Sequence, residues 1–257
     1  MQSHLTIAVI SDRGLVRPHN EDAHAILNPP GVETGVPHDA CRLLVVADGL
    51  GGHNAGEIAS QIAVDTLAGR YRANPSALFD EGQIRQALRE AHRRIQKEAR
   101  RNAFQHGMGT TVALVAIKGE QAIAVHVSDS RVYLIRNGVI SRLTLDHSWV
   151  EQQVMAGLLP AEAASEHPFR HVITQALGAM DHINPAFHAW TLRAGDIILL
   201  CTDGLHGTLD ERTIHHVATT RPPEEAAQEL LRLAREAGGP DNITLILARV
   251  DTLEESP

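Results

Sequence analysis

Short apolar runs alternate along the chain with longer stretches in which apolar residues recur every three or four positions. The runs are strand-sized and are bounded by Gly, Asp, Asn or Pro, a pattern typical of buried strands. The turn signal at residues 136–138 (RNG) ends one of the later runs. The pattern predicts strands over residues 5–10, 23–27, 43–47, 111–117, 122–127, 132–135, 197–201 and 243–250.

The helical period appears in four places. Apolar residues at 55, 58, 59, 62 and 63, and again at 84, 87, 88, 91 and 95, form one buried face each. The polar side of the second helix carries Arg85, Arg89, Arg93 and Lys97, which we interpret as a solvated surface. Further helices are predicted at 211–218 and 224–236, with a short helix near residue 146 and a loop or small flap over 157–170.

Strands come in runs and helices come in pairs, so adjacent strands should pair antiparallel. This order predicts an α+β fold in which two sheets pack face to face with helices outside them, and it argues against a doubly wound parallel sheet. No linker, charge block or low-complexity tract divides the 257 residues, so we expect a single domain over residues 1–257.

Composition narrows the class of protein. Hydrophobic residues make up 43% of the chain, which is ordinary for a packed globular protein. The formal net charge of −8 and the lack of a basic stripe with interleaved aromatics argue against nucleic-acid binding. Cys41 and Cys201 lie inside apolar runs, so we expect buried free thiols in a reducing compartment. Without a targeting segment or a membrane-length apolar run, the prediction is a cytoplasmic protein that does not enter the membrane.

The most informative feature is a near-repeat of an acid after a buried strand. Residues 45–50 (VVADGL) and 200–205 (LCTDGL) both place Asp-Gly-Leu directly after an apolar run. Further acids stand at the margins of other strands or beside Arg17. The full set of candidate acids is Glu21, Asp22, Asp48, Asp129, Asp203 and Asp241.

A buried carboxylate is costly unless it is paired or bound to a cation. Arg17 and Arg131 are the only arginines close in sequence to these acids and cannot neutralise all of them. Any single Asp-Gly is more often an ordinary turn, but five such places together favour a metal site. The ligands are all oxygens, which suits Mg²⁺ or Mn²⁺ and not Zn²⁺. An acidic chain that acts on phosphate also needs cations to reduce repulsion.

Together with their order, these motifs resemble the PPM family, the type 2C metal-dependent Ser/Thr phosphatases, in its bacterial form. The resemblance covers nearly the whole chain. Its motifs are residues 11–22, 47–57, 108–111, 128–131, 143–148, 195–196, 202–205 and 239–242.

The resemblance implies a β-sandwich flanked by antiparallel helix pairs, with a small flap at about residues 147–172. It implies two core ions, Mn²⁺ or Mg²⁺, with Asp48 bridging them. The Gly49 carbonyl and Glu21 or Asp22 would bind one ion, and Asp203 and Asp241 the other. Asp129, with Asp203, matches a weaker third-metal site of bacterial relatives.

The implied reaction is hydrolysis of phosphoserine and phosphothreonine on proteins. A water that bridges the ions would attack phosphorus, and Arg17 would hold the phosphate oxygens. Phosphorylated proteins are the expected partners, among them a Ser/Thr kinase that the enzyme opposes or the targets of that kinase.

The chain departs from the family in two places. Leu50 stands where animal members carry a histidine proposed as general acid, so protonation of the leaving group falls by default to metal-bound water. Ser128 stands where glycine is common. His53 and His147 are expected to cap or pack rather than react. His167, Arg170 and His171 either contact substrate or are structural.

Other functions must be weighed against this one. A metal-dependent nuclease or phosphodiesterase could use clustered aspartates, but the acidic charge and the lack of a basic groove count against it. A pseudophosphatase that only binds partners would be expected to lack Asp48, Asp203 or Asp241, and all three are present. A regulatory phosphatase of anti-sigma or secretion pathways would differ in substrate only.

Overall fold

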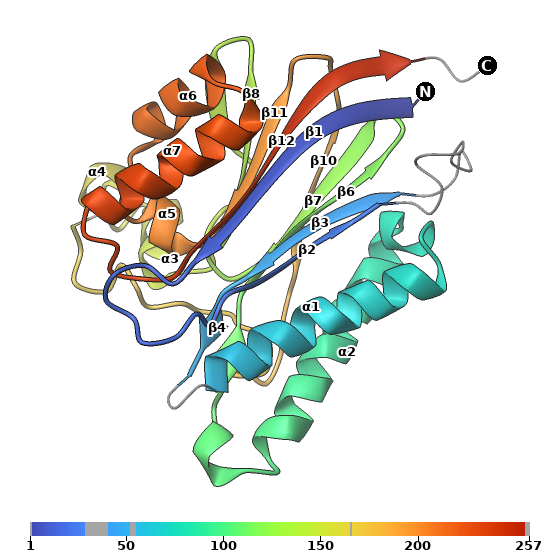
Figure 1. Cartoon of the computed structure of the whole chain (residues 1–257). Helices are drawn as coiled ribbons and strands as arrows, with labels where there is room; N and C mark the ends of the chain where they lie inside the picture. The colour runs from blue at the N-terminus through green and yellow to red at the C-terminus, as the bar shows by residue number, and fades with distance from the viewer. Residues whose placement is uncertain (1, 29–40, 52–54, 165, 255–257) are drawn as a thin grey trace.

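Two five-stranded antiparallel sheets face each other in the computed structural model, which describes residues 2–28, 41–51, 55–164 and 166–254. Helices cover the outer face of each sheet (Figure 1). This is the arrangement that the order of strands and helices predicts. Among the described residues, no helix combines the length and the apolar character needed to cross a membrane.

The first sheet contains both terminal strands, which pair with each other over nearly their whole length. Its strand order is β1-β12-β11-β8-β9. The strands are β1 (Gln2–Asp12), β12 (Ile243–Glu254), β11 (Ile197–Cys201), β8 (Arg131–Arg136) and β9 (Val139–Arg142).

The second sheet has the order β10-β7-β6-β3-β2, and a separate two-stranded ladder pairs β4 with β5. The strands are β10 (Ala186–Thr191), β7 (Gln121–Val127), β6 (Val112–Lys118), β3 (Arg42–Ala47), β2 (Ala23–Leu27), β4 (Gly49–Leu50) and β5 (Gly109–Thr110).

Each sheet is covered by one helix pair. α1 (Ala55–Ala73) and α2 (Glu81–Ala99) lie on the second sheet, and α6 (Glu211–Thr220) and α7 (Pro223–Glu236) lie on the first (Figure 1). The shorter helices are α3 (Trp149–Met155), α4 (Ala161–Ala164), α5 (Asp203–His206) and the 3₁₀ turns η1 (Ala77–Phe79) and η2 (Ala103–Gln105).

The central strands are buried on both faces, which explains their unbroken apolar sequence. In β3, Leu43 and Val45 pack toward α1 and α2, whereas Leu44 and Val46 pack between the sheets. Cys41 and Cys201 are buried free thiols, as expected. Burial raises the pKa of Cys41 to about 11, so this thiol stays protonated.

The region around residues 147–172 follows β9 of the first sheet and precedes β10 of the second. Its base is closed by two backbone hydrogen bonds, from Trp149 N to Val172 O and from Thr174 N to His147 O, each 2.7 Å. The predicted short helix begins at Trp149 rather than near residue 146 because Ser148 caps it, accepting a bond from Glu151 N. The stretch over 157–170, expected to be irregular, contains the four-residue helix α4.

Candidate metal centre

The backbone of Asp48 is held where β3 ends. Asp48 N donates to Thr111 Oγ1 at 2.8 Å, and Thr110 Oγ1 and Thr111 N both donate to Asp48 O, at 2.8 and 2.9 Å. With its N–H and C=O satisfied by two threonines, the residue leaves its carboxylate free to face the space between the strand ends.

Gly49 follows Asp48 in a very narrow space. A Cβ there would lie 2.2 Å from Gly56 O and 2.5 Å from Glu21 O. A Cβ on Gly56 would lie 2.6 Å from Glu21 Oε2. The two glycines therefore let the start of α1 approach β4 and place the Glu21 side chain beside them.

Asp203 is the first residue of α5 and is separated from β11 by Thr202 alone. The next residue, Gly204, packs against the turn before β12, because a Cβ on it would lie 2.0 Å from Asn242 O. Just before Asp203, the Thr202 hydroxyl donates to Asp22 Oδ2 at 2.9 Å. Close packing thus brings Asp203, Asp22 and the turn at Asp241 to the same edge.

Asn242 organises the segment that carries Arg17 and Glu21. Its amide accepts a bond from Glu21 N at 2.8 Å and donates to Arg13 O and His19 O, each at 2.9 Å. Its neighbour Asp241 forms an ion pair of 2.7 Å with Arg17. The loop between β1 and β2 is therefore fixed to the turn before β12 by one amide and one ion pair.

Asp129 lies in a turn held from two sides. Ser128 has a positive φ of 84°, its N–H donates to His147 Nδ1 at 3.1 Å, and its carbonyl accepts a bond from His147 N at 2.9 Å. His206 Nε2 lies 3.1 Å from Asp129 O. Burial lowers the pKa of His206 to about 3, so the ring is neutral and donates to that carbonyl.

The acids are gathered closely enough to disturb one another's ionisation. Burial, with the charges of neighbouring acids, raises the pKa of Asp22 and of Asp129 to about 7. Burial and the charge of Asp241 raise the pKa of Asp203 to about 6. Burial and the charges of Asp22 and Asp203 raise the pKa of Asp48 well above its usual range. Such mutual repulsion is relieved when a cation binds.

Among the residues that the structure describes, two carboxylate oxygens are buried without a hydrogen-bond partner, Asp22 Oδ1 and Asp203 Oδ1. Buried orphan acceptors are rare and call for a ligand. All of the candidate acids except Asp22 line a cavity of about 570 Å³. Seven of the eight residues proposed from the sequence line it: Arg17, Glu21, Asp48, Gly49, Asp129, Asp203 and Asp241. An all-oxygen set of this kind fits Mg²⁺ or Mn²⁺.

The carboxylates do not converge on a single point. Among the described residues, no three acidic, histidine or cysteine side chains converge as ligands of one ion, and Asp241 is paired with Arg17. The orphan oxygens and the raised pKa values, rather than a preformed ligand cage, are the features that fit a cation.

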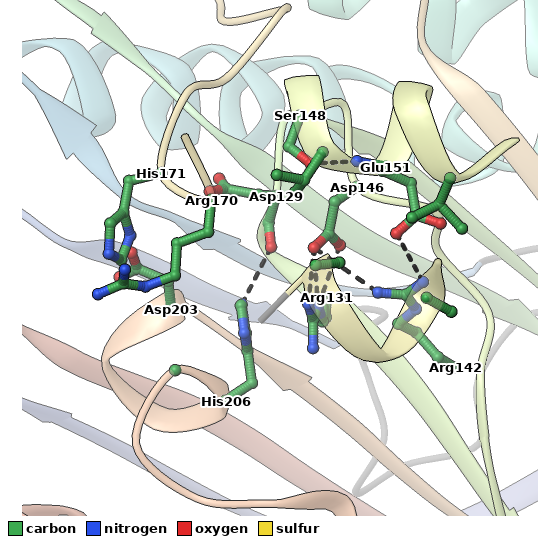
Figure 2. Close-up of a pocket in the computed structure, with 15 residues that line it drawn as sticks. Asp129, Arg131, Arg142, Asp146, Ser148, Glu151, Arg170, His171, Asp203 and His206 are labelled. Atoms are coloured by element: carbon green, nitrogen blue, oxygen red, sulfur yellow. Dashed lines mark hydrogen bonds and ion pairs between the residues drawn. The ribbon is translucent and has the colours of Figure 1, made fainter. Parts of the chain in front are cut away.

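A second cavity, of about 370 Å³, adjoins the first next to α3 and α4 (Figure 2). Asp146 lies between two arginines: Arg131 Nη2 is 2.7 Å and Arg142 Nη1 3.7 Å from its Oδ2. Arg142 also donates to Glu151 of α3 at 2.8 Å. Figure 2 shows this chain of charges running from the sheet to α3.

Arg170 and His171 line both cavities, together with Asp129 and Asp203. Arg170 and His171 therefore border the acidic centre. His167, the third residue in question, packs instead against the Trp149 ring, with the ring centres 5.0 Å apart. His53 lies outside the described residues.

Several residues that shape the centre are not evident from the sequence. Arg131, which the sequence suggests as a neutralising partner for the acids of the centre, pairs instead with Asp146. His206 carries no motif of its own, although its position three residues after Asp203 on one helix turn is a usable signal. Thr202 and Asn242 lie within the family motifs, which assign them no role.

Comparison with known proteins gives consistent matches. The sequence pattern of the family described as protein phosphatase 2C matches residues 19–247. The serine/threonine protein phosphatase PstP of Mycobacterium tuberculosis is 35% identical over 246 residues, which cover 96% of this chain and 45% of that protein. The chain thus spans less than half of that relative. The protein phosphatase PhpP of Streptococcus pneumoniae is 34% identical over 250 residues, with 96% and 98% coverage.

Solved structures agree with the sequence matches. The catalytic domain of PstP in complex with two manganese ions superimposes with a TM-score of 0.82 at 35% identity, covering 96% of this chain and 99% of that one. The serine/threonine phosphatase Stp1 of Staphylococcus aureus gives a TM-score of 0.88 at 30% identity, with 98% and 97% coverage. The sandwich and its helix pairs are therefore shared with these enzymes.

Proposed function

The chain belongs to the protein phosphatase 2C family, and from that premise we propose that it removes phosphate from phosphoserine and phosphothreonine of proteins at the acidic centre. PstP and Stp1 are named serine/threonine phosphatases, and PhpP is named a protein phosphatase. The predicted α+β sandwich, the enzyme class and the use of Mn²⁺ or Mg²⁺ agree with this membership.

The observation that supports the proposal best is the pair of orphan oxygens on Asp22 and Asp203. We assign Glu21, Asp22, Asp48 and the Gly49 carbonyl to one side of the metal centre. Asp203 and Asp241 form the other side, with Asp48 between. Asp129 is the additional acid beside Asp203, for a third ion.

Bound divalent cations would supply an activated water and would neutralise charge on the phosphoryl oxygens. The chain's own residues bind and orient the phosphate. Arg17, half-exposed at the rim, offers two parallel N–H donors once it leaves Asp241. Thr202 and Asn242 hold Asp22 and the Glu21 segment in place. The flap brings Arg170 and His171 to the other side of the cavity.

We further propose that the chain works as one catalytic unit over residues 1–257, with residues 147–172 as its flap. Its partners in the cell would be phosphorylated proteins, among them a Ser/Thr kinase or the targets of that kinase, in the cytoplasm. A genome that encodes this chain but no Ser/Thr kinase would contradict the kinase part of this proposal.

The direct test is turnover of a phosphothreonine peptide by metal-stripped protein, with and without added Mn²⁺. We expect turnover only with Mn²⁺, and none in Asp48→Ala or Asp203→Ala, because each removes a carboxylate of the centre. The exposed Asp65 on α1 provides a matched control, since Asp65→Ala removes an acid far from the cavity. Activity on bis(p-nitrophenyl) phosphate but not on the peptide would favour a phosphodiesterase instead.

Asp129→Ala separates the third-ion role from the core centre. We expect this variant to keep Mn²⁺-dependent stabilisation by the two core ions and to lose rate. Calorimetric titration of Mn²⁺ would report the lost ion independently of turnover. Wild-type activity in Asp129→Ala would remove Asp129 from the site.

A further inference from the structure

The outer face of α2 carries a concentration of positive charge that the acidic centre does not use. Residues 81–101 hold seven of the chain's 23 Lys and Arg residues and only three of its 31 acids. The rest of the chain is correspondingly more acidic than the net charge of −8 indicates. A local cationic surface on an acidic protein needs a physical reason.

Four of these cations form one exposed column, which we call the α2 stripe: Arg89, Arg93, Lys97 and Arg100. With 3.6 residues per turn they fall within a sector of about 80° and span about 16 Å along the helix axis. Each side chain is exposed. Within the described part of the chain, none of the four has an ion-pair or hydrogen-bond partner for its side chain.

The other cations of this segment are partnered. Arg85 pairs with Glu81 at 2.7 Å, and Arg101 pairs with Glu98 at 2.8 Å. Arg94 donates to Thr66 Oγ1 at 2.9 Å. Glu90 is occupied by Arg70 of α1. The acids of α2 are therefore paired with arginines outside the α2 stripe, and they do not neutralise its charges.

Helix stability does not account for the α2 stripe. Like charges at i and i+4, as in Arg89–Arg93 and Arg93–Lys97, destabilise a helix. The helix dipole favours cations only in the last turn, where Lys97 and Arg100 lie. Arg89 and Arg93 lie in the middle of α2 and gain nothing from it.

The chemistry of the face selects the partner. A membrane-binding helix presents apolar residues beside its cations, but no large hydrophobic residue is exposed between Gly82 and Arg101, and Phe104, which is 77% exposed, lies beyond the end of α2 in η2. Single-stranded nucleic acid binds where aromatic rings accompany the cations, and no Phe, Tyr or Trp lies in this stretch. An extended acidic peptide of about five residues would span the α2 stripe at about 3.3 Å per residue.

The α2 stripe also lies toward the catalytic end of the molecule. Beyond its C-terminus the chain passes through η2 to β5, which pairs with Gly49–Leu50 of β4, next to Asp48. Figure 1 shows α2 as an outer helix that runs antiparallel to α1. A substrate whose phosphoresidue enters the acidic centre can therefore extend a tail along α2.

We propose that the α2 stripe is a docking surface for an acidic segment of the phosphoprotein substrate. The inference rests on the proposed phosphatase function and names the class of substrate that this enzyme prefers. Docking would lower KM without changing kcat, because the α2 stripe touches no reacting atom. It would weaken as salt screens the charges.

The test compares phosphothreonine peptides that differ only in a tail. The tail is six Glu, six Ser or six Lys residues, joined before or after the phosphothreonine by a Gly/Ser linker of about 20 residues, which reaches about 25 Å. We expect the Glu tail to lower KM by roughly five- to tenfold relative to the Ser tail. The Lys tail should give no such gain, and 0.5 M NaCl should remove the difference.

Charge reversal identifies the surface. Arg89→Glu with Arg93→Glu should abolish the gain from the Glu tail and leave kcat and KM for the Ser-tailed peptide unchanged. Arg72→Glu with Arg212→Glu is the matched control, because it reverses two exposed arginines elsewhere. A Glu-tail gain that survives in the first variant, or no gain in the wild-type protein, would overturn the proposal while the phosphatase function stands.

A binding measurement tests docking even if the proposed phosphatase function is wrong. If no peptide is turned over with Mn²⁺, anisotropy of a fluorescent hexaglutamate peptide still measures binding to the α2 stripe. Binding to wild-type protein that is lost in the Arg89/Arg93 variant supports docking. Stronger binding of phosphatidylserine vesicles or of single-stranded RNA than of the peptide would replace the acidic protein as the partner.

Discussion

At residue 128 a serine occupies backbone that favours glycine. Its φ of 84° lies in the left-handed region, and the side chain is fully buried next to Asp129. His147 holds this conformation through two hydrogen bonds, one to the N–H and one to the carbonyl of Ser128. The departure from the family pattern at Ser128 thus leaves the turn intact, because the neighbouring histidine over-determines it.

Ser128→Gly should therefore fold at least as well as the wild-type protein. Relief of the positive φ favours the variant by up to about 1 kcal/mol, offset by the loss of the 3.2 Å bond from Ser128 Oγ to Asp129 Oδ1. Urea unfolding should place the variant within about 1 kcal/mol of wild type, and Ser128→Val should be clearly less stable. A large loss of stability in Ser128→Gly would contradict this account of the turn.

Individual site residues are predictable where a short motif carries them. Asp48 and Asp203 each follow an apolar strand within a repeated Asp-Gly-Leu, so burial and chemistry can both be inferred locally. His206 and Thr202 contribute through contacts with Asp129 and Asp22 that are 77 and 180 residues away in sequence. Such contacts leave no mark in the local pattern.

Strands and helices, like single site residues, are predictable where the local sequence pattern is clear. β3, buried on both faces, is evident from its apolar run. β10 and β9, by contrast, are not evident from the sequence, because none of their residues is buried, and apolar and polar residues do not alternate regularly along them. The Asp-Gly after Cys201 suggests a turn, but these residues form α5, since Gly204 packs against Asn242 and lets the helix start at once.

The flap helix α3 is tied to the sheet by a chain of charges. Arg142 and Glu151 are 24% and 18% exposed, so their ion pair is shielded from solvent more than a surface pair. The pair fixes α3, and α3 packs through Trp149 on Phe169, directly before Arg170. The position of Arg170 over the acidic centre thus depends on a contact made at the other end of the flap.

Arg142→Gln and Glu151→Gln should each raise KM for a phosphothreonine peptide severalfold with kcat nearly unchanged. The double variant should be no worse than Arg142→Gln, because that variant has already lost the Arg142–Glu151 ion pair along with the contact of Arg142 to Asp146. Steady-state kinetics of the wild-type protein, the two single variants and the double variant gives a double-mutant cycle. Arg249→Gln, in the exposed Arg249–Asp251 pair, is the control and should have no effect. Additive losses would show that the two residues act separately.

At the scale of the whole molecule, the two sheets bring to one edge acids that come from both ends of the chain. Glu21 and Asp22 precede β2, Asp48 follows β3, and Asp203 and Asp241 flank the first sheet's central strands. The cores on either side of the edge are apolar and closely packed. The fold therefore stabilises a cluster of charges that repel one another.

This arrangement makes the stability of the metal-free protein depend on pH. Burial and neighbouring acids raise the pKa of Asp22 and Asp129 to about 7 and of Asp203 to about 6, whereas these groups titrate near 3.9 in an unfolded chain. The folded state then binds more protons between about pH 4 and pH 7. The contribution of these groups to stability is present below about pH 4 and is lost as the pH rises to about 7.

Metal-free protein should accordingly lose several kcal/mol of unfolding free energy from this cluster between pH 5 and pH 7.5, at about 1.4 kcal/mol for each pKa unit. Asp48→Asn removes one of the repelling charges, so the variant should lose less over the same range and exceed wild type at pH 7.5. Asp65→Asn, on the surface, should follow wild type. At pH 7.5, a hundredfold excess of Mn²⁺ over Kd should raise the unfolding free energy of the wild-type protein by about 2.7 kcal/mol. It should raise that of Asp48→Asn by little. Urea unfolding at the two pH values, with and without Mn²⁺, measures each quantity.

Equal pH profiles for wild type and Asp48→Asn would mean that the acids do not repel one another in the folded protein, and that the cavity is not held ready for a cation.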